Sequence, residues 1–223
     1  MKYLLTAVLG FSLFAAACED PAANKTKATV NEPAANSASN STNAAAVKPS
    51  APAVKGEALA INGENSKVEF TGSKVTGKHD GGFRTLSGTI DLVNGKPEES
   101  SVWVDIDATS VYSDDEKLTG HLKSKDFFDV ETFPKASFKS TKIVADISKG
   151  GGAYTVTGDF DLHGVTKSIS FPATIKTGAD SVDVEAEFSI NRKDFGIVYA
   201  GKADDLIRDD VVIRLNLKAP RKN

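Results

Sequence analysis

Cysteine is nearly absent from this chain, which has one in 223 residues. A single thiol cannot form an internal disulfide or a cysteine-based zinc cluster, so packing and hydrogen bonding must stabilise the fold. Excess positive charge is also absent, since 27 Lys and Arg stand against 30 Asp and Glu and the net charge is −3. A chain of this charge lacks the electrostatic footprint for a nucleic-acid backbone, and we expect no nucleic-acid partner.

Long apolar runs are confined to the N-terminus. Apolar residues dominate from Tyr3 to Ala17, a run of signal-peptide length that is too short to span a membrane comfortably. The run ends in small residues directly before Cys18, as lipoprotein processing requires. We therefore expect residues 1–17 to be a signal peptide and Cys18 to carry a lipid anchor. An ordinary cleavage site with an incidental cysteine is the alternative. Lipidation predicts a bacterial, extracytoplasmic lipoprotein, on the periplasmic side or the cell surface.

Aromatic residues are missing from the segment that follows. Between Glu19 and Glu57 there are 11 Ala, 4 Pro and 5 Asn, and no aromatic residue. Such a composition cannot form a core of its own, and as a flexible coil it would reach about 35 Å. We therefore predict that residues 18–57 are a lipid-anchored, disordered linker and that residues 58–223 form the folded domain.

The folded part alternates apolar and polar residues with a period of two, as in Val102 to Ala108, which indicates strands with one apolar face. The same pattern is found in 85–92, 154–162, 165–175, 182–190 and 211–218, and more weakly in 66–78, 136–147 and 195–199. Gly and Asn pairs between these segments predict hairpin turns. Helical character is limited to Ser113–Lys125, where Ser113 and Glu116 have capping-box spacing.

About eight sequential antiparallel strands would leave long exposed edges unless the sheet closed on itself. We therefore predict an all-β fold: an antiparallel up-and-down barrel of eight strands with one short helix. A two-sheet sandwich is the alternative. An eight-stranded barrel can be filled by its own side chains or can hold one slender ligand, and that choice determines the function.

Five segments of the sequence carry a resemblance to a known family. The main one is H-L-K-S-K-D-F-F-D-V-E-T-F-P-K-A-S-F at 121–138; the others are K-H-D-G-G-F at 78–83, S-G-T-I at 87–90, G-D-F-D-L-H-G-V-T-K at 158–167 and I-N-R-K-D-F-G at 190–196. In these segments the chain resembles the YceI-like family of extended-lipocalin, polyisoprenoid-binding proteins. The resemblance implies a barrel around an elongated apolar cavity that binds an isoprenoid chain, without a catalytic assignment. His163 departs from it, because arginine is frequent there.

The candidate ligand-binding residues are drawn from the apolar strand faces and from phenylalanine, which outnumbers tyrosine by 12 to 4 and carries no polar group that needs a partner. They are Leu86, Ile90, Val104, Ile106, Phe127, Phe128, Phe133, Phe138, Phe160, Phe188, Phe195 and Arg192. The same side chains would also suit a solid core, which is the alternative. For Arg192, one interpretation is a salt bridge with Asp194, and the other is contact with a pyrophosphate or quinone head group.

Catalytic and metal sites have little support. His79, His121 and His163 lack the close spacing of a zinc-ligand pair, and the aspartates of 203–210 lack the order of a calcium loop. There is no G-x-S-x-G motif. We expect no metal, no cofactor and no enzymatic activity. The alternative is a hydrolase or isomerase that uses one of the three histidines at the mouth of the barrel.

Overall fold

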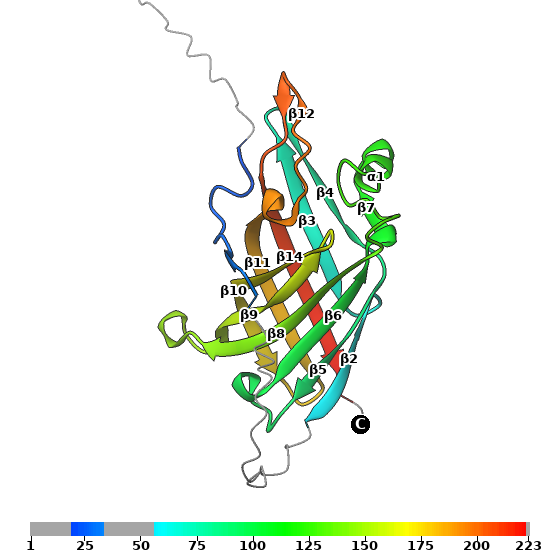
Figure 1. Ribbon diagram of the computed structural model, residues 1–223. Helices are drawn as coiled ribbons and strands as arrows, with labels where there is room; N and C mark the ends of the chain where they lie inside the picture. Colours follow the sequence, from blue (N-terminus) through cyan, green and yellow to red (C-terminus); the bar gives the residue numbers. More distant parts are fainter. Residues whose placement is uncertain (1–18, 34–55, 222–223) are drawn as a thin grey trace, which may run out of the picture.

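The computed structural model describes residues 19–33 and 56–221, and it shows a strongly curled antiparallel sheet (Figure 1). The strands are β1 (Thr29–Asn31), β2 (Glu57–Asn62), β3 (Lys67–Lys74), β4 (Gly77–Phe83), β5 (Leu86–Leu92), β6 (Ser101–Asp107), β7 (Val111–Ser113), β8 (Lys135–Ala145), β9 (Ala153–Leu162), β10 (Val165–Thr177), β11 (Ser181–Asn191), β12 (Gly201–Lys202), β13 (Asp205–Leu206) and β14 (Asp210–Pro220). The helical segments are α1 (Glu116–Leu122) and the 3₁₀ turns η1 (Pro97–Glu99), η2 (Ala108–Ser110), η3 (Ile147–Lys149) and η4 (Arg192–Phe195). The predicted signal peptide and Cys18 lie outside the described residues. Within the described residues, no helix is both long and apolar enough to cross a membrane.

The sheet closes into a barrel through bent strands. β2 and β3 together pair with β5 and β4: Asn62 is opposite Ser87 before the bend, and Val68 is opposite Phe83 after it. β3 also pairs with β14, and β5 also pairs with β6, so this one hairpin joins both ends of the sheet. With β2–β3, β4–β5 and β6–β7 each counted as one bent strand, the barrel has eight antiparallel strands. The predicted barrel is confirmed, and the sandwich is wrong.

The period-two pattern orients the strands as the sequence predicts. In β6, Val104 and Ile106 are buried, whereas Trp103 is exposed and Asp105 is half-buried. The hairpin turns also fall where Gly and Asn predict them: His163 and Gly164 both have positive φ, 54° and 72°, in the tight turn between β9 and β10. Positive φ at both central residues matches the right-handed twist of the flanking strands.

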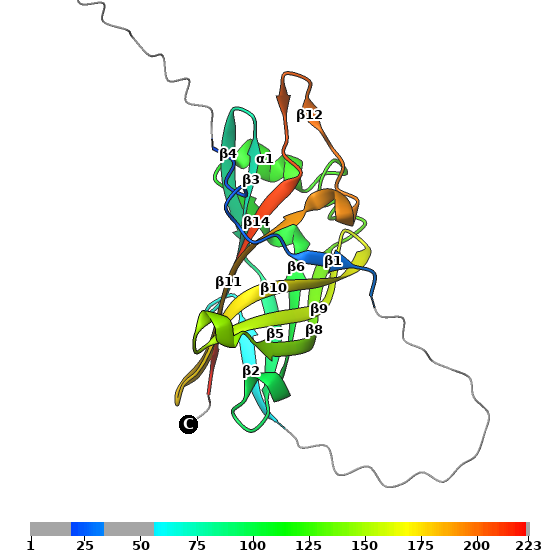
Figure 2. The same ribbon diagram turned by 90° about the vertical axis from the view of Figure 1, so that its left-hand side faces the viewer.

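The barrel wall contains one seam, between β10 and β11. These strands pair only over Thr174–Thr177 and Val182–Glu185, and beyond that point the N-terminal segment lies between them (Figure 2). β1 pairs with β10 through Thr29 opposite Ser170 and Asn31 opposite Ser168, while the backbone of Ser189 in β11 exchanges two hydrogen bonds with residues 26 and 28, of 3.0 and 2.8 Å.

The predicted linker therefore does not begin at Cys18, because residues 20–32 are part of the barrel. Composition correctly excludes a core for this segment, but a strand that adds to an open sheet edge needs only its backbone hydrogen bonds. Ala28 is nevertheless 5% exposed and belongs to the apolar core. Residues 34–55 of the predicted linker lie outside the described residues, and its last residue, Glu57, already begins β2.

Two local predictions are corrected. The helix begins later than Ser113, because Asp115 is the N-cap: its carboxylate accepts a hydrogen bond of 2.7 Å from the backbone N–H of Leu118. The weak strand predicted at 195–199 is absent from the structure. Its first residue ends η4, and Gly196 follows with φ of 75°, which breaks the extended conformation.

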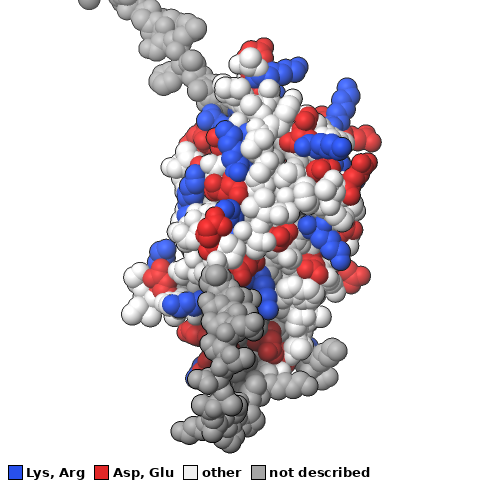
Figure 3. All heavy atoms as spheres, viewed as in Figure 1, with Lys and Arg blue, Asp and Glu red and all other residues white. Residues whose placement is uncertain are grey.

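Charged residues of both signs are mixed over the face drawn in Figure 3, with Lys and Arg adjacent to Asp and Glu. This mixture agrees with the near balance of 27 basic and 30 acidic residues. Most of the described ion pairs are at least partly exposed, and such pairs contribute about 0–1 kcal/mol each. The fold therefore depends on its apolar interior.

Candidate functional site: the barrel cavity

The barrel encloses an apolar cavity of about 200 Å³. Its wall is formed by the inward faces of the strands, by the end of α1 with the chain that follows it, and by the segment after η4. The lining residues include Val68, Phe70, Phe83, Ile90, Val104, Ile106, Phe127, Phe128, Phe138, Ile143, Val156, Phe160, Ile169, Phe171, Ile175, Val182, Phe188, Ile190, Ile197, Ile207, Leu215 and Leu217. The wall is thus almost entirely hydrocarbon.

Phenylalanine rings form two groups along this cavity. Near α1, the rings of Phe70, Phe83 and Phe128 pack with centroids 5.6–6.2 Å apart. Farther along, Phe171 lies between Phe138, at 5.6 Å, and Phe188, at 4.3 Å. Ring contacts at such distances each add about 0.5–1.5 kcal/mol beyond the burial of area. They give the cavity wall fixed shape.

Nine of the twelve sequence-predicted residues line the cavity. These are Ile90, Val104, Ile106, Phe127, Phe128, Phe138, Phe160, Phe188 and Arg192. The structure thus brings together residues that come from five strands, η4 and the segment after α1. Their spatial convergence follows from the closure of the barrel.

Leu86, Phe133 and Phe195 lie outside the cavity lining. Leu86 is buried in the core near the bend between β4 and β5. Phe133 packs on the outer turn between β9 and β10, with its ring 4.7 Å from that of His163. Phe195 is fully buried behind Phe160, at a centroid distance of 5.2 Å. None of the three side chains is among those that line the cavity.

The candidate list omitted three cavity phenylalanines, Phe70, Phe83 and Phe171. The signal for Phe171 was present, because it lies on the apolar face of an alternating segment. Phe70 lies in the weakly alternating 66–78 segment, and Phe83 is flanked by Gly82 and Arg84, so neither showed a clear apolar face. Their place became visible only when β3 and β4 were paired.

Arg192 lies at the end of the cavity, but its guanidinium is already used by the protein. Its side chain is buried and donates to the backbone carbonyls of Ile197, Arg208 and Ile207, at 2.7, 3.1 and 3.4 Å. It also contacts the Asp209 carboxylate at 3.3 Å. Burial lowers the pKa of Arg192, and the nearby carboxylate partly opposes this effect.

Both interpretations of Arg192 are thereby revised. Its acidic partner is Asp209 rather than Asp194, because η4 and the start of β14 lie side by side. By donating to three of its carbonyls, the guanidinium fixes the conformation of the segment 197–209. Its hydrogen-bonding capacity is largely taken up, and the geometry does not favour it as a phosphate receptor.

The three histidines are not brought together. His79 contacts Asp114 at 2.8 Å, His121 contacts Asp126 at 2.8 Å, and His163 contacts the backbone carbonyl of Phe195 at 3.2 Å. In the part of the chain that the structure describes, no group of three or more His, Cys, Asp or Glu could hold a metal ion. No observation of the site therefore favours the histidine-based hydrolase or isomerase.

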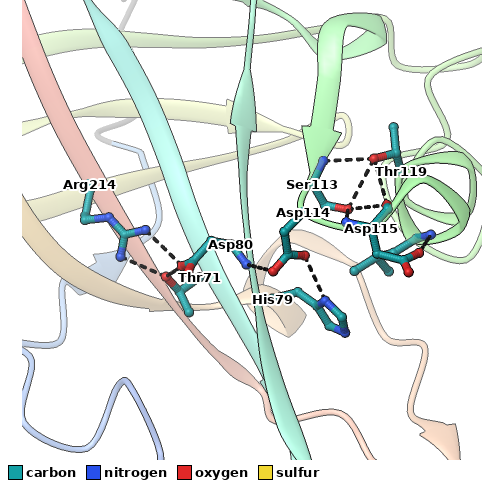
Figure 4. A network of polar contacts seen from close by, with 9 residues as sticks. Thr71, His79, Asp80, Ser113, Asp114, Asp115, Thr119 and Arg214 are labelled. Carbon is teal, nitrogen blue, oxygen red and sulfur yellow. Dashed lines mark hydrogen bonds and ion pairs between the residues drawn. The ribbon is translucent and has the colours of Figure 1, made fainter.

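A polar network lies outside the cavity, on β3, β4 and β14 (Figure 4). Arg214 donates to Thr71 at 2.8 Å and contacts Asp80 at 3.1 Å, and the Thr71 hydroxyl donates to the Asp80 carboxylate. These contacts, with the Thr71 bond as the largest cause, lower the pKa of Asp80. Asp114 links the network to the segment before α1 by accepting a hydrogen bond of 3.2 Å from the Asp80 backbone.

Comparison with known proteins agrees with this architecture. Residues 59–219 match the family model described as YceI-like domain. A UPF0312 protein of Pseudomonas putida (strain W619) is 33% identical over 139 residues, which is 60% of this chain and 71% of the relative. A UPF0312 protein of Pseudomonas fluorescens (strain SBW25) is 34% identical over 137 residues, with coverages of 59% and 70%.

Two solved structures share the fold. BcnA of Burkholderia cenocepacia superimposes with a TM-score of 0.63 at 24% identity, over 71% of this chain and 99% of that one. A polyisoprenoid binding domain from Saccharophagus degradans, implicated in plant cell wall breakdown, gives 0.58 at 18% identity, over 74% and 100%. From the family match over most of its barrel, this chain belongs to the YceI-like domain family.

Proposed function

We propose that the protein binds a polyisoprenoid chain or a similar amphiphilic lipid in the barrel cavity and sequesters or carries it outside the cytoplasm. The observation that carries the proposal is the cavity of about 200 Å³ with its hydrocarbon wall. Apolar cavities of about 150 Å³ already stay dry and bind small hydrocarbons. A polar ligand would lose its water there without gaining hydrogen bonds, whereas each buried methylene of a prenyl chain contributes about 0.8 kcal/mol.

Family membership supports the same ligand class, because a relative of the same fold is described as a polyisoprenoid binding domain. A prenyl quinone or a prenyl pyrophosphate would place its chain in the cavity and leave its head group at the end near Arg192. The Arg192 guanidinium already donates to backbone carbonyls of the protein. The proposal therefore assigns the binding affinity to the isoprenoid chain of the ligand rather than to its head group.

The test is to purify the protein without a tag, extract it with organic solvent and identify the extract by mass spectrometry. We expect an isoprenoid or a related lipid in the extract, or saturable uptake of an added prenyl quinone by protein that is purified empty. No lipid in the extract together with no uptake would overturn the proposal.

The location is proposed on separate grounds. Small residues before Cys18 favour processing of residues 1–17 and acylation of the cysteine. Labelled palmitate should therefore be incorporated into the wild-type protein and not into a Cys18→Ala variant, and the wild-type protein should fractionate with membranes. Equal labelling of the two proteins would contradict lipidation.

A further inference from the structure

The N-terminal segment is fixed to the barrel at several points. Asp20 contacts Arg208 at 3.4 Å, Lys25 contacts Glu187 at 2.7 Å, and Lys27 contacts Asp210 at 2.7 Å. The backbone bonds to Ser189 and the β1–β10 pairing follow directly. Residues 20–31 therefore belong to the wall of the barrel, and no long tether separates them from Cys18.

Chain connectivity then locates the predicted anchor. Cys18 precedes Asp20 by two residues and consecutive Cα atoms are about 3.8 Å apart, so an acyl anchor on Cys18 would be attached within about 8 Å of Asp20, whose carboxylate contacts Arg208. Figures 1 and 2 both draw the start of this segment in the half of the molecule that carries β12.

The structure near Arg208 has exposed apolar side chains, which we call the apolar tip: Val75, Val198 and Leu206. Their exposed fractions are 54%, 64% and 49%. The backbone N–H of Val75 donates to the carbonyl of Leu206 at 3.2 Å, so the β3–β4 turn and the hairpin β12–β13 are adjacent.

The base of the hairpin carries apolar side chains on both faces, while its turn carries Lys202 and Asp204. Ile197 and Ile207 line the cavity, while their chain neighbours Val198 and Leu206 point away from it and are exposed. An ordinary surface hairpin has polar residues on the outer face, so exposed apolar residues beside a cavity mark a contact surface. Another exposed apolar residue, Ile147 at 91%, lies on the β8–β9 turn, far from β12 in both views.

We propose that the apolar tip rests on the bilayer that holds the acylated Cys18, so that the Ile197–Ile207 end of the cavity faces the membrane. The inference depends on the proposed anchor and deepens the proposed lipid binding, because it gives the ligand a short path between bilayer and cavity. The position of Asp20 selects this end over the β8–β9 turn.

Charge plays little part in this contact. Several charged side chains around the apolar tip are paired, as in Lys74 with Asp205, Lys193 with Asp209 and Arg208 with Asp20. The turn of the hairpin adds one exposed charge of each sign, Lys202 and Asp204, so the charge around the tip is balanced. Because these charges are balanced, no basic patch directs the contact, and its orientation should depend little on ionic strength.

The experiment uses the processed full chain in vesicles of phosphatidylethanolamine and phosphatidylglycerol. Leu206→Cys and Ile147→Cys each receive an environment-sensitive fluorophore, since the native cysteine is blocked by its acyl chains. We expect a lipid-borne quencher to reduce the emission of the label at 206 several-fold more than that of the label at 147. Equal quenching, or stronger quenching at 147, would overturn the orientation.

A variant with about 20 Gly and Ser residues inserted between Glu19 and Asp20 is the matched control. It keeps both the acylated cysteine and the apolar tip but joins them through a long flexible linker. The difference in quenching between the labels at 206 and 147 should therefore shrink. A difference that stays unchanged would keep the contact of the tip with the bilayer but overturn the part of the proposal in which the short link to Cys18 selects this end of the barrel.

Unlabelled wild-type protein gives a second measurement that needs no substitution. Vesicles should protect the trypsin site at Lys202, in the tip, and leave the site at Lys149, in η3, open to cleavage. Unprotected Lys202 would count against the contact. Lipid extraction from the same preparation reports the proposed function separately, because orientation does not depend on a loaded cavity.

Discussion

Phe171 of β10 and Phe188 of β11 are stacked, with ring centroids 4.3 Å apart and planes at 12°. They lie opposite each other just beyond Thr174 and Glu185, where the backbone pairing of the two strands ends. The two rings thus cover the seam from the cavity side, while β1 pairs with β10 along the same seam. This one contact therefore serves both the integrity of the barrel and the shape of the cavity.

Replacement of a cavity ring by a charge should abolish ligand uptake. Phe188→Asp places an unpaired carboxylate against hydrocarbon, at a cost of several kcal/mol, and Phe128→Asp does the same near α1. Uptake of a prenyl quinone, measured by fluorescence quenching or extraction, should be lost or the variants should not fold. Phe133→Leu, outside the cavity, is the control and should bind normally. Wild-type uptake by both charged variants would show that the ligand lies elsewhere.

The N-terminal segment should contribute to the stability of the barrel. Ala28→Glu puts a carboxylate where the side chain is 5% exposed, and we expect a loss of about 2–3 kcal/mol in the free energy of unfolding. Thr29→Glu, one residue on and exposed, should change it by less than about 0.5 kcal/mol. Urea denaturation of the two variants makes the comparison. Equal midpoints would mean that residues 20–32 are not part of the folded unit.

Arg192→Met should loosen the segment 197–209. The substitution leaves three carbonyls without their buried donor, and we expect a loss of about 3 kcal/mol together with faster proteolysis at Lys202. Lys193→Met removes an exposed partner of the same Asp209 and should cost at most about 0.5 kcal/mol. If the two variants were equally stable, the hydrogen bonds of Arg192 would not be what fixes the segment 197–209.

Acid should weaken the contacts of Asp80. The pKa of this carboxyl is lower in the folded state than its ordinary value of 3.8. Its stabilising effect is therefore present above the unfolded pKa and is lost as the pH falls through the folded one. Asp80→Asn should be less stable than wild type at pH 7, by under about 1 kcal/mol because the site is largely exposed. The difference should shrink below about pH 4. A gap that is independent of pH in thermal melts would contradict this.

Gly158 is needed for the ring of Phe138 to lie on the wall of the cavity. A Cβ at Gly158 would lie 2.4 Å from the Phe138 ring and 2.5 Å from the backbone oxygen of Lys139, so Gly158→Ala should lower the melting temperature and alter uptake. Gly72→Ala, in β3 with nothing within 4 Å, should keep or slightly raise the melting temperature. The reverse order of stability would refute the close approach.

The barrel architecture and the apolar character of its interior can both be predicted from the amino-acid sequence. Alternation in segments such as 102–108 fixes which side chains face inward, since a strand places successive residues on opposite faces. A tight turn such as His163–Gly164 fixes the order of neighbouring strands. The choice of phenylalanine over tyrosine makes the wall apolar, and nine of the twelve candidate residues line the cavity for these reasons.

The lengths over which neighbouring strands pair, and the segments that close the gaps between them, could not be predicted from the sequence. The seam between β10 and β11 arises from the twist and curvature of the sheet, which no local sequence pattern predicts. Residues 26–31 bind at this seam through backbone hydrogen bonds, which do not depend on their composition. For the same reason, Arg192 forms its ion pair with Asp209 rather than with Asp194. Phe133 likewise packs against His163 and does not line the cavity. Such contacts join residues that are distant in sequence, and their identity depends on where closure of the barrel places each backbone.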